Sequence, residues 1–235
     1  MPENVTVTVG DDTMDVYLSE PAGEAKGAVV VLQEAYGVNG HIQDVCRRFS
    51  DVGYVAAAPH LFHRTGGPVI DYEDMDTVIE HIMQLTVNGL EVDLEATLEL
   101  LAGRGFETKR VAAVGFCAGG SVAFLAAAYW ELGAAVSFYG GGVTQGRFGM
   151  PPLLDLAPTL QTPWLGFFGD LDESIPIDGV EGLREAAKRA SVPTDIVRYP
   201  EATHAFHCDE RASYHEASAK DAWQRTLDFL GQHIG

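Results

Sequence analysis

A cysteine near the middle of the chain has the sequence surroundings of a catalytic nucleophile. Cys117 lies in Gly115-Phe116-Cys117-Ala118-Gly119, between a strand-like apolar run and a run of small residues typical of a buried helix. This is the spacing of the G-x-S-x-G turn, where small residues two positions away let the strand and helix approach closely. The N-terminus of the following helix favours a thiolate. We therefore expect Cys117 to be a nucleophile, the alternative being a small buried residue.

An acid and a histidine follow in the chain order that such a turn requires. Asp170 and Asp172 come directly after the apolar run 165–169, and His204 follows the predicted strand 194–199. His204 can accept the thiol proton and later give it to the leaving group, while the acid orients the imidazole. We prefer Asp172 for its Gly-x-x-Asp placement, and Asp170 remains the other candidate. Taken singly, either acid could be a helix N-cap and His204 a solvated loop residue, but the joint order favours a triad.

Two backbone N–H groups are candidates to stabilise an oxyanion. One belongs to Ala118, directly after the nucleophile, and the second is expected from Ala35, in the loop after the apolar run 28–32. Glu34 stands beside Ala35, where an ionised carboxylate would repel a thiolate and raise its pKa. The alternative is that Glu34 braces this loop by hydrogen bonds.

The elements that must position these residues are buried strands alternating with amphipathic helices. Val5, Val7 and Val9 alternate with polar residues before a Gly-Asp-Asp turn, which predicts an N-terminal antiparallel hairpin. The following apolar runs are continuous, as in strands covered on both faces, and helical spacings separate them. We expect a single α/β domain over residues 1–235, with a mostly parallel sheet, helices on both faces and ligands at the carboxyl ends of the strands. The predicted strands are 28–32, 54–58, 111–116, 134–139, 165–169 and 194–199, and the helical spacings cover 42–49, 75–82, 94–101, 180–187 and 223–230.

Composition excludes several classes of partner. The 235 residues include 15 Lys and Arg against 34 Asp and Glu, a formal charge of −19, which disfavours nucleic acids and anionic membranes as partners. No apolar run is long enough to span a bilayer, and the first residues lack the pattern of a secretory leader, so we expect a cytoplasmic protein. The three cysteines do not form a disulfide framework. No histidine spacing matches a known metal site, and we expect neither a metal nor a cofactor.

With these residues in view, the chain resembles the dienelactone hydrolase (carboxymethylenebutenolidase-like) family of α/β-hydrolases from about residue 5 to residue 230. The resemblance implies the triad Cys117–Asp172–His204, oxyanion donors Ala35 and Ala118, and a thioester formed on cleavage of small esters or lactones. It also implies that Glu34 holds the resting thiol and accepts its proton when substrate displaces it. Tyr36, Tyr139 and Phe206, which lie in the shared motifs, are expected to contact substrate. The motifs are Gln33–Asn39, Ala58–Phe62, Gly115–Gly120, Phe138–Gly140, Gly169–Asp172 and Tyr199–Phe206.

The chain departs from the resemblance at the arginines that bind a substrate carboxylate in this family. Cys208 stands where an arginine is expected after His204, and the predicted helix around 71–85 contains acidic residues but no arginine. Losing a bidentate clamp disfavours dianionic substrates, so neutral or weakly acidic compounds are expected to be preferred, with Arg64 or His207 as possible anion contacts.

Two other functions are compatible with the sequence. The chain could be an idle α/β-hydrolase that binds a small molecule, or a redox sensor in which Cys208 resolves oxidised Cys117. The sequence leaves the oligomeric state open between monomer and dimer.

Overall fold

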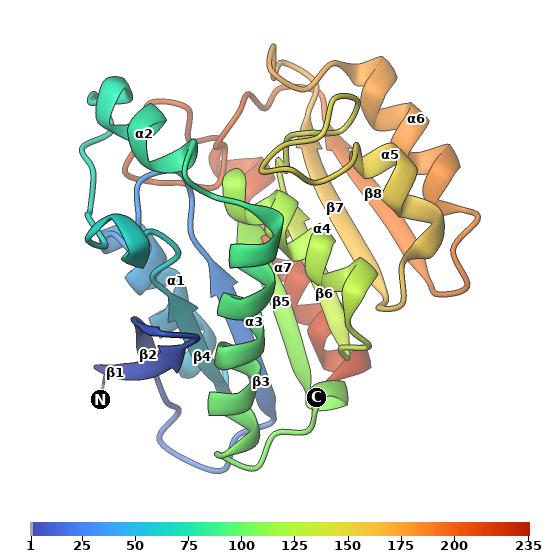
Figure 1. Cartoon of the computed structure of the whole chain (residues 1–235). Coiled ribbons are helices and arrows are strands. Elements are labelled where there is room, and N and C mark those ends of the chain that lie inside the picture. Colours follow the sequence, from blue (N-terminus) through green and yellow to red (C-terminus); the bar gives the residue numbers. More distant parts are fainter. Residues whose placement is uncertain (1) are drawn as a thin grey trace.

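The computed structural model describes residues 2–235 and contains one eight-stranded sheet with the order β1-β2-β4-β3-β5-β6-β7-β8 (Figure 1). β1 pairs antiparallel with β2, β2 pairs antiparallel with β4, and all other neighbours are parallel. The mostly parallel sheet begun by an antiparallel hairpin, which the sequence predicts, is therefore confirmed. The strands are β1 (Glu3–Val9), β2 (Asp12–Ser19), β3 (Gly27–Leu32), β4 (Tyr54–Pro59), β5 (Val111–Phe116), β6 (Ala134–Phe138), β7 (Trp164–Gly169) and β8 (Thr194–Tyr199).

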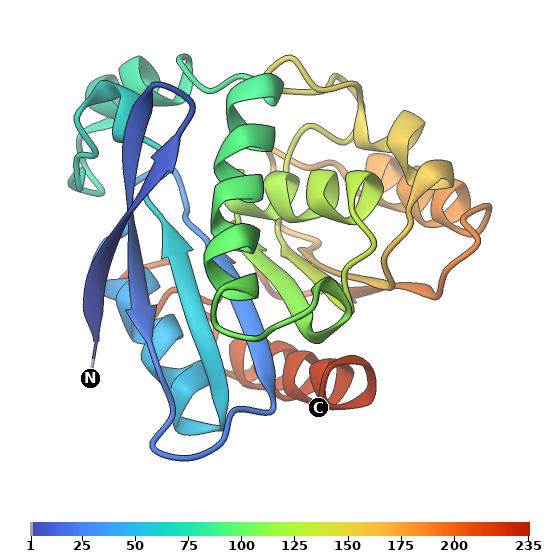
Figure 2. The same cartoon turned by 60° about the horizontal axis from the view of Figure 1, so that its bottom comes forward.

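Helices cover both faces of the sheet (Figure 2). In β3, Val29 and Val31 share a core with α1 and α7, whereas Val30 and Leu32 share a core with α3 and α4. This alternation explains why the apolar run of β3 is continuous, since both of its faces are covered. The helices are α1 (Gly40–Asp51), α2 (Met75–Ile82), α3 (Val87–Ala102), α4 (Ala118–Tyr129), α5 (Leu153–Leu156), α6 (Ile177–Ala187) and α7 (Glu216–His233).

The helical spacings predicted from the sequence all fall within observed helices. They correspond to α1, α2, α3, α6 and α7, and α4 is the predicted helix of small residues. The four-residue α5 is not predicted, because it is too short to show a periodic stripe. None of the helices described here is long and apolar enough to cross a membrane.

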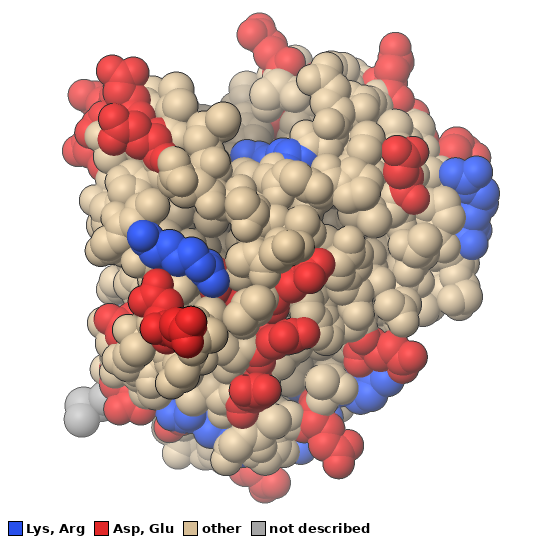
Figure 3. Space-filling view, viewed as in Figure 1, with Lys and Arg blue, Asp and Glu red and all other residues tan. Residues whose placement is uncertain are grey.

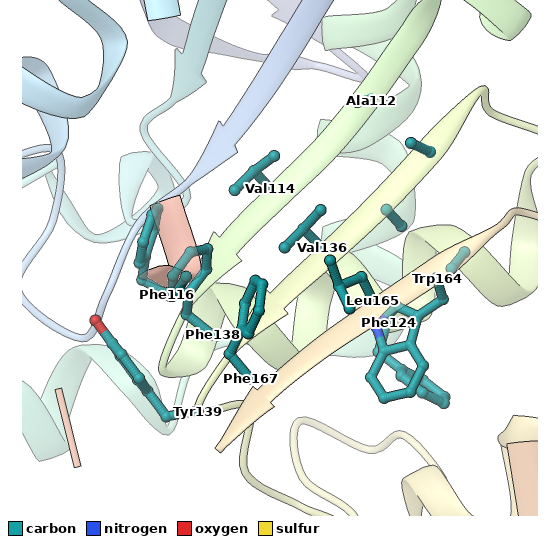
Figure 4. Close-up of a cluster of buried hydrophobic side chains, with 14 of the residues drawn as sticks. Ala112, Val114, Phe116, Phe124, Val136, Phe138, Tyr139, Trp164, Leu165 and Phe167 are labelled. Carbon is teal, nitrogen blue, oxygen red and sulfur yellow. The ribbon is translucent and has the colours of Figure 1, made fainter. Parts of the chain in front are cut away.

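A row of aromatic rings supports the carboxyl ends of the central strands (Figure 4). The rings of Phe116, Phe138 and Phe167 come from neighbouring strands, with centroid separations of 4.6 and 4.9 Å. Backbone bonds continue the pairing one step further, from Cys117 N to Phe138 O at 3.0 Å and from Tyr139 N to Phe167 O at 2.7 Å. The loops that follow these strands therefore start from a rigid, fully packed layer.

Candidate active site

Cys117 occupies a strained turn between β5 and α4. Its backbone has φ 51° and ψ −110°, a conformation that costs a non-glycine residue on the order of 1–3 kcal/mol and occurs at functional sites. A Cβ at Gly115 would meet the carbonyl oxygen of Gly119, and a Cβ at Gly119 would meet that of Leu32, well inside van der Waals contact. The two glycines of the motif thus let β3, β5 and α4 meet. The thiol is partly exposed at the N-terminus of α4.

His204 lies between Cys117 and Asp172. Its Nδ1 is 2.6 Å from Asp172 Oδ2, and its imidazole lies next to the side chain of Cys117. Burial lowers the pKa of His204, but the negative charges of Cys117 and Asp172 outweigh burial and raise the pKa to about 10. The imidazole of His204 therefore favours its protonated form.

Asp172 is buried and fully engaged in hydrogen bonds. Its second oxygen, Oδ1, accepts from the backbone N–H of Ser174 at 2.9 Å and from the Ser174 hydroxyl at 2.6 Å. Burial raises the pKa of Asp172, but the bonds from His204 and Ser174 lower it further, so the net shift is downward. Asp170, the other candidate acid, instead forms a two-pronged ion pair with Arg198 on β8 at 2.7 and 2.8 Å. Of the two acids, only Asp172 is paired with His204.

The two expected oxyanion donors lie in loops that are bonded to each other. The N–H of Gly119 donates to the carbonyl of Gln33 at 2.9 Å, which ties the start of α4 to the loop containing Ala35. Gln33 in turn accepts from the N–H of Leu61 through its side chain at 3.1 Å. Within residues 2–235, the N–H groups of Ala35 and Ala118 have no recorded hydrogen-bond acceptor. Both groups are thus free to donate to a substrate oxygen.

Glu34 is buried beside the nucleophile with one oxygen unpartnered. Its Oε1 accepts from the Tyr139 hydroxyl at 3.2 Å, whereas its Oε2 has no hydrogen-bond partner among the described residues. Burial and the charge of Glu34 raise the pKa of Tyr139 well above its usual value, so this phenol stays a donor. The ring of Tyr139 lies 5.1 Å from that of His204. The Glu34 side chain therefore bonds to the loop after β6 and not to its own loop.

The three aromatic residues expected to contact substrate differ in their positions. The ring of Tyr36 lies 4.7 Å from that of Tyr72, and Tyr139 lies between Glu34 and His204. Phe206 is fully buried and packs on Tyr139 and Tyr199, so it supports the His204 loop from the core and has no surface for a substrate. Tyr139 is equally buried, so neither ring presents a surface to substrate in this structure, and the substrate contacts expected of both stay predictions.

Two arginines that no sequence motif indicates lie near Cys117. The guanidinium of Arg147, from the loop after β6, approaches the Cys117 side chain and stacks on Phe148 with 4.3 Å to the ring centroid. Arg211 lies over the rings of Tyr36 and Tyr72 at 5.3 and 5.4 Å. Within the described chain, neither arginine has a carboxylate within 4.0 Å.

Arg64 and His207, the anion contacts suggested by the sequence, interact with other groups in the structure. Arg64 forms bonds of 2.9 and 2.8 Å with the buried carboxylate of Asp93. His207 is buried among aromatic rings, and burial lowers its pKa well below the usual value, so it stays neutral. Arg147 and Arg211 thus supply the positive charge near the thiol. No local sequence signal marks either arginine: Arg211 directly follows Asp209 and Glu210, and Arg147 lies in a glycine-rich loop without a periodic pattern.

The strand order, the strained cysteine turn after β5, and the acid and histidine after β7 and β8 define an α/β-hydrolase. The sequence profile of the dienelactone hydrolase family matches residues 14–234, and the chain belongs to that family. Its members are hydrolases of lactones and esters by name, and this chain is an enzyme of that class.

Relatives and solved structures agree with this assignment. A provisionally named carboxymethylenebutenolidase of Yersinia pestis is 39% identical over 233 residues, covering 97% of this chain and 87% of the relative. One from Salmonella typhimurium is 39% identical over 231 residues, covering 96% and 85%. The crystal structure of a provisionally assigned dienelactone hydrolase from Klebsiella pneumoniae has a TM-score of 0.92 and 37% identity, and each chain is covered to 99%.

Proposed function

We propose that the protein cleaves small esters or lactones through a thioester on Cys117. The observation that carries this proposal is the position of His204 between the Cys117 side chain and the Asp172 carboxylate, which is 2.6 Å away. Acyl transfer requires a nucleophile, a base next to it and an acid that orients the base.

Acylation begins with the Cys117 sulfur as its anion and His204 protonated. The sulfur attacks the carbonyl carbon, a C–S bond forms, and the carbonyl electron pair moves to oxygen. The N–H groups of Ala35 and Ala118 stabilise this oxyanion. When the carbonyl re-forms, the C–O bond to the leaving alcohol breaks, and His204 gives its proton to the alcohol oxygen. The products of this step are the alcohol and a thioester.

Deacylation uses the same groups in reverse. His204, now neutral, takes a proton from water, whose oxygen attacks the thioester carbon. Collapse of the second oxyanion breaks the C–S bond and restores the Cys117 anion and protonated His204. A lactone gives one hydroxy acid in place of separate acid and alcohol.

Glu34 suits the resting state of this cycle. Its unpartnered Oε2 is a buried acceptor, so the carboxylate can hold the protonated thiol at rest and take its proton when substrate binds, which leaves the Cys117 anion that begins acylation. A protonated thiol oxidises less readily than a thiolate, which would protect the nucleophile between turnovers.

The redox alternative has less support. Cys208 is buried and bonds to the Tyr72 hydroxyl at 3.4 Å, and burial together with Glu34 raises its pKa to about 11. A resolving thiol needs access and thiolate character, and Cys208 has neither. Free cysteines suit a reducing compartment, and we propose the cytoplasm as the site of action.

The direct test compares Cys117→Ala with Cys46→Ala on 4-nitrophenyl acetate. Cys46 is a buried core thiol away from the strand ends, so its variant controls for loss of a sulfur alone. We expect Cys117→Ala to lower kcat/KM at least about 10³-fold and Cys46→Ala to leave it within about threefold. Rapid quenching and intact-mass analysis of the wild type should show an acetyl adduct on Cys117. Unchanged hydrolysis by Cys117→Ala would refute the mechanism.

A further inference from the structure

An apolar groove lies between α2, α3 and the loop after β6. It is a cavity of about 470 Å³, a size that holds small organic ligands. Met83 at its rim is 74% exposed, which is unusual for a large apolar side chain. We refer to it as the α2–α3 groove, and its main lining residues are Ile82, Met83, Leu85, Val87, Arg147 and Phe148.

Residues that line the groove contact the site region in two places. On one wall, the guanidinium of Arg147 approaches Cys117. On the other, Ile82 and Leu85 pack against the cluster that contains Ala35 and Tyr36, in the loop of the second oxyanion donor. Figure 3 shows basic atoms in the hollow beside α2, whereas acidic side chains surround it on the outer surface. A carbonyl held at Cys117 would therefore have the groove on one side.

Phe148, in the loop after β6, contributes an aromatic ring to the wall of the groove. Phe148 has φ 57°, a left-handed conformation that is costly for an aromatic residue. Stacking under Arg147 holds the ring in place, and a Cβ at Gly142 would press on the Arg147 side chain. This strain is maintained next to the nucleophile, where a fixed apolar wall can orient a substrate.

We propose that the α2–α3 groove binds the apolar acyl portion of the substrate, a medium-length alkyl or aromatic group attached to the scissile carbonyl. The proposal rests on the thioester mechanism above, because it places the acyl carbon at Cys117. Each methylene that leaves water for the groove favours binding by up to about fourfold. The acidic residues of α2 and its N-cap, Asp74, Asp76 and Glu80, are not among the groove's lining residues, so the apolar surface is left for the ligand.

The test measures kcat/KM for 4-nitrophenyl acetate, butyrate and hexanoate. We expect the wild type to favour hexanoate over acetate at least tenfold. Val87→Glu places a charge in the groove at the first residue of α3, where glutamate is compatible with the helix, and should reduce the ratio to about two or less. Met83→Ser, at an exposed position, should reduce it severalfold. Val92→Glu is the matched control, because Val92 is 40% exposed on the same helix and does not line the groove.

Each outcome bears on one proposal. Equal kcat/KM across the series in the wild type, or the same ratio in Val87→Glu as in Val92→Glu, overturns the groove as the acyl site. Hydrolysis that survives Cys117→Ala overturns the nucleophile, whatever the chain-length ratio. Calorimetry with hexanoate and acetate adds a readout that needs no turnover, and tighter hexanoate binding that Val87→Glu abolishes supports the groove.

Discussion

The charge on His204 depends on its two neighbours. Removing the sulfur in Cys117→Ala leaves burial opposed only by Asp172, so the pKa of His204 should fall clearly below its wild-type value near 10. Histidine NMR titration measures this directly, with Cys46→Ala as the control. The unfolded chain loses this proton near pH 6.5 and the folded chain keeps it to about 10. The stabilisation is therefore complete below pH 6.5 and is lost as the pH rises toward 10. An unchanged pKa in Cys117→Ala would mean that the sulfur does not act on the imidazole.

The arginines near the thiol change the expected substrate preference. The sequence predicts a preference for neutral or weakly acidic compounds, because other residues occupy both positions at which the family carries an arginine. Arg147 and Arg211 now lie by Cys117 without acidic partners, so we expect a carboxylated aryl ester to be preferred over its methyl-capped form by about tenfold or more.

The matched variants are Arg147→Gln, Arg211→Gln and Arg189→Gln, measured as the ratio of kcat/KM for the two esters. Arg189 is exposed beyond the last residue of α6, far from the carboxyl ends of the strands. The first two substitutions should each lower the ratio, and the third should not. A wild-type ratio near one would restore the expectation drawn from the sequence.

The two candidate triad acids show what sequence spacing can and cannot decide. Asp170 and Asp172 both follow β7 closely, so the motif could only rank them. The decision comes from Arg198, which is far along the chain but lies next to Asp170 because β8 pairs with β7. When strand pairing brings together two residues that are distant in the chain, no local pattern in a single sequence shows that they will form an ion pair.

At the scale of elements, the turn between β5 and α4 depends on close backbone contact. Gly119→Ala should destabilise the protein by at least about 2 kcal/mol, because the new Cβ meets the carbonyl of Leu32 and β3 cannot move without disturbing the sheet. Gly231→Ala is the control: it lies in α7 with nothing within 4 Å, and alanine should stabilise the helix by up to about 1 kcal/mol. Urea unfolding measures both, and equal stabilities would contradict the packing argument.

The strands and long helices could be predicted from the sequence, whereas the path of the loop 139–152 could not. Continuous apolar runs and helical stripes locate the strands and long helices, since period and burial are properties of local sequence. The approach of Arg147 to Cys117 depends instead on the path of the loop 139–152. Several glycines and the left-handed Phe148 set this path, and no periodic pattern encodes it.

At the scale of the whole molecule, the site is a local exception in a strongly acidic protein. The formal charge is −19, and acidic side chains are spread over the surface seen in Figure 3. A carboxylated substrate is therefore repelled at long range and attracted only when it comes close to Arg147 and Arg211. These two effects respond differently to salt, because exposed distant charges are screened more than partly buried near ones.

Ionic strength separates the two effects. Raising it from about 10 to 150 mM shortens the Debye length from roughly 30 to 8 Å, which removes most of the long-range repulsion. We expect kcat/KM for the carboxylated ester to rise by up to about threefold, while that of its methyl-capped form stays constant. The neutral ester is the control for salt effects on the chemical step. A fall for the carboxylated ester would show that attraction by the two arginines outweighs the repulsion of the whole surface.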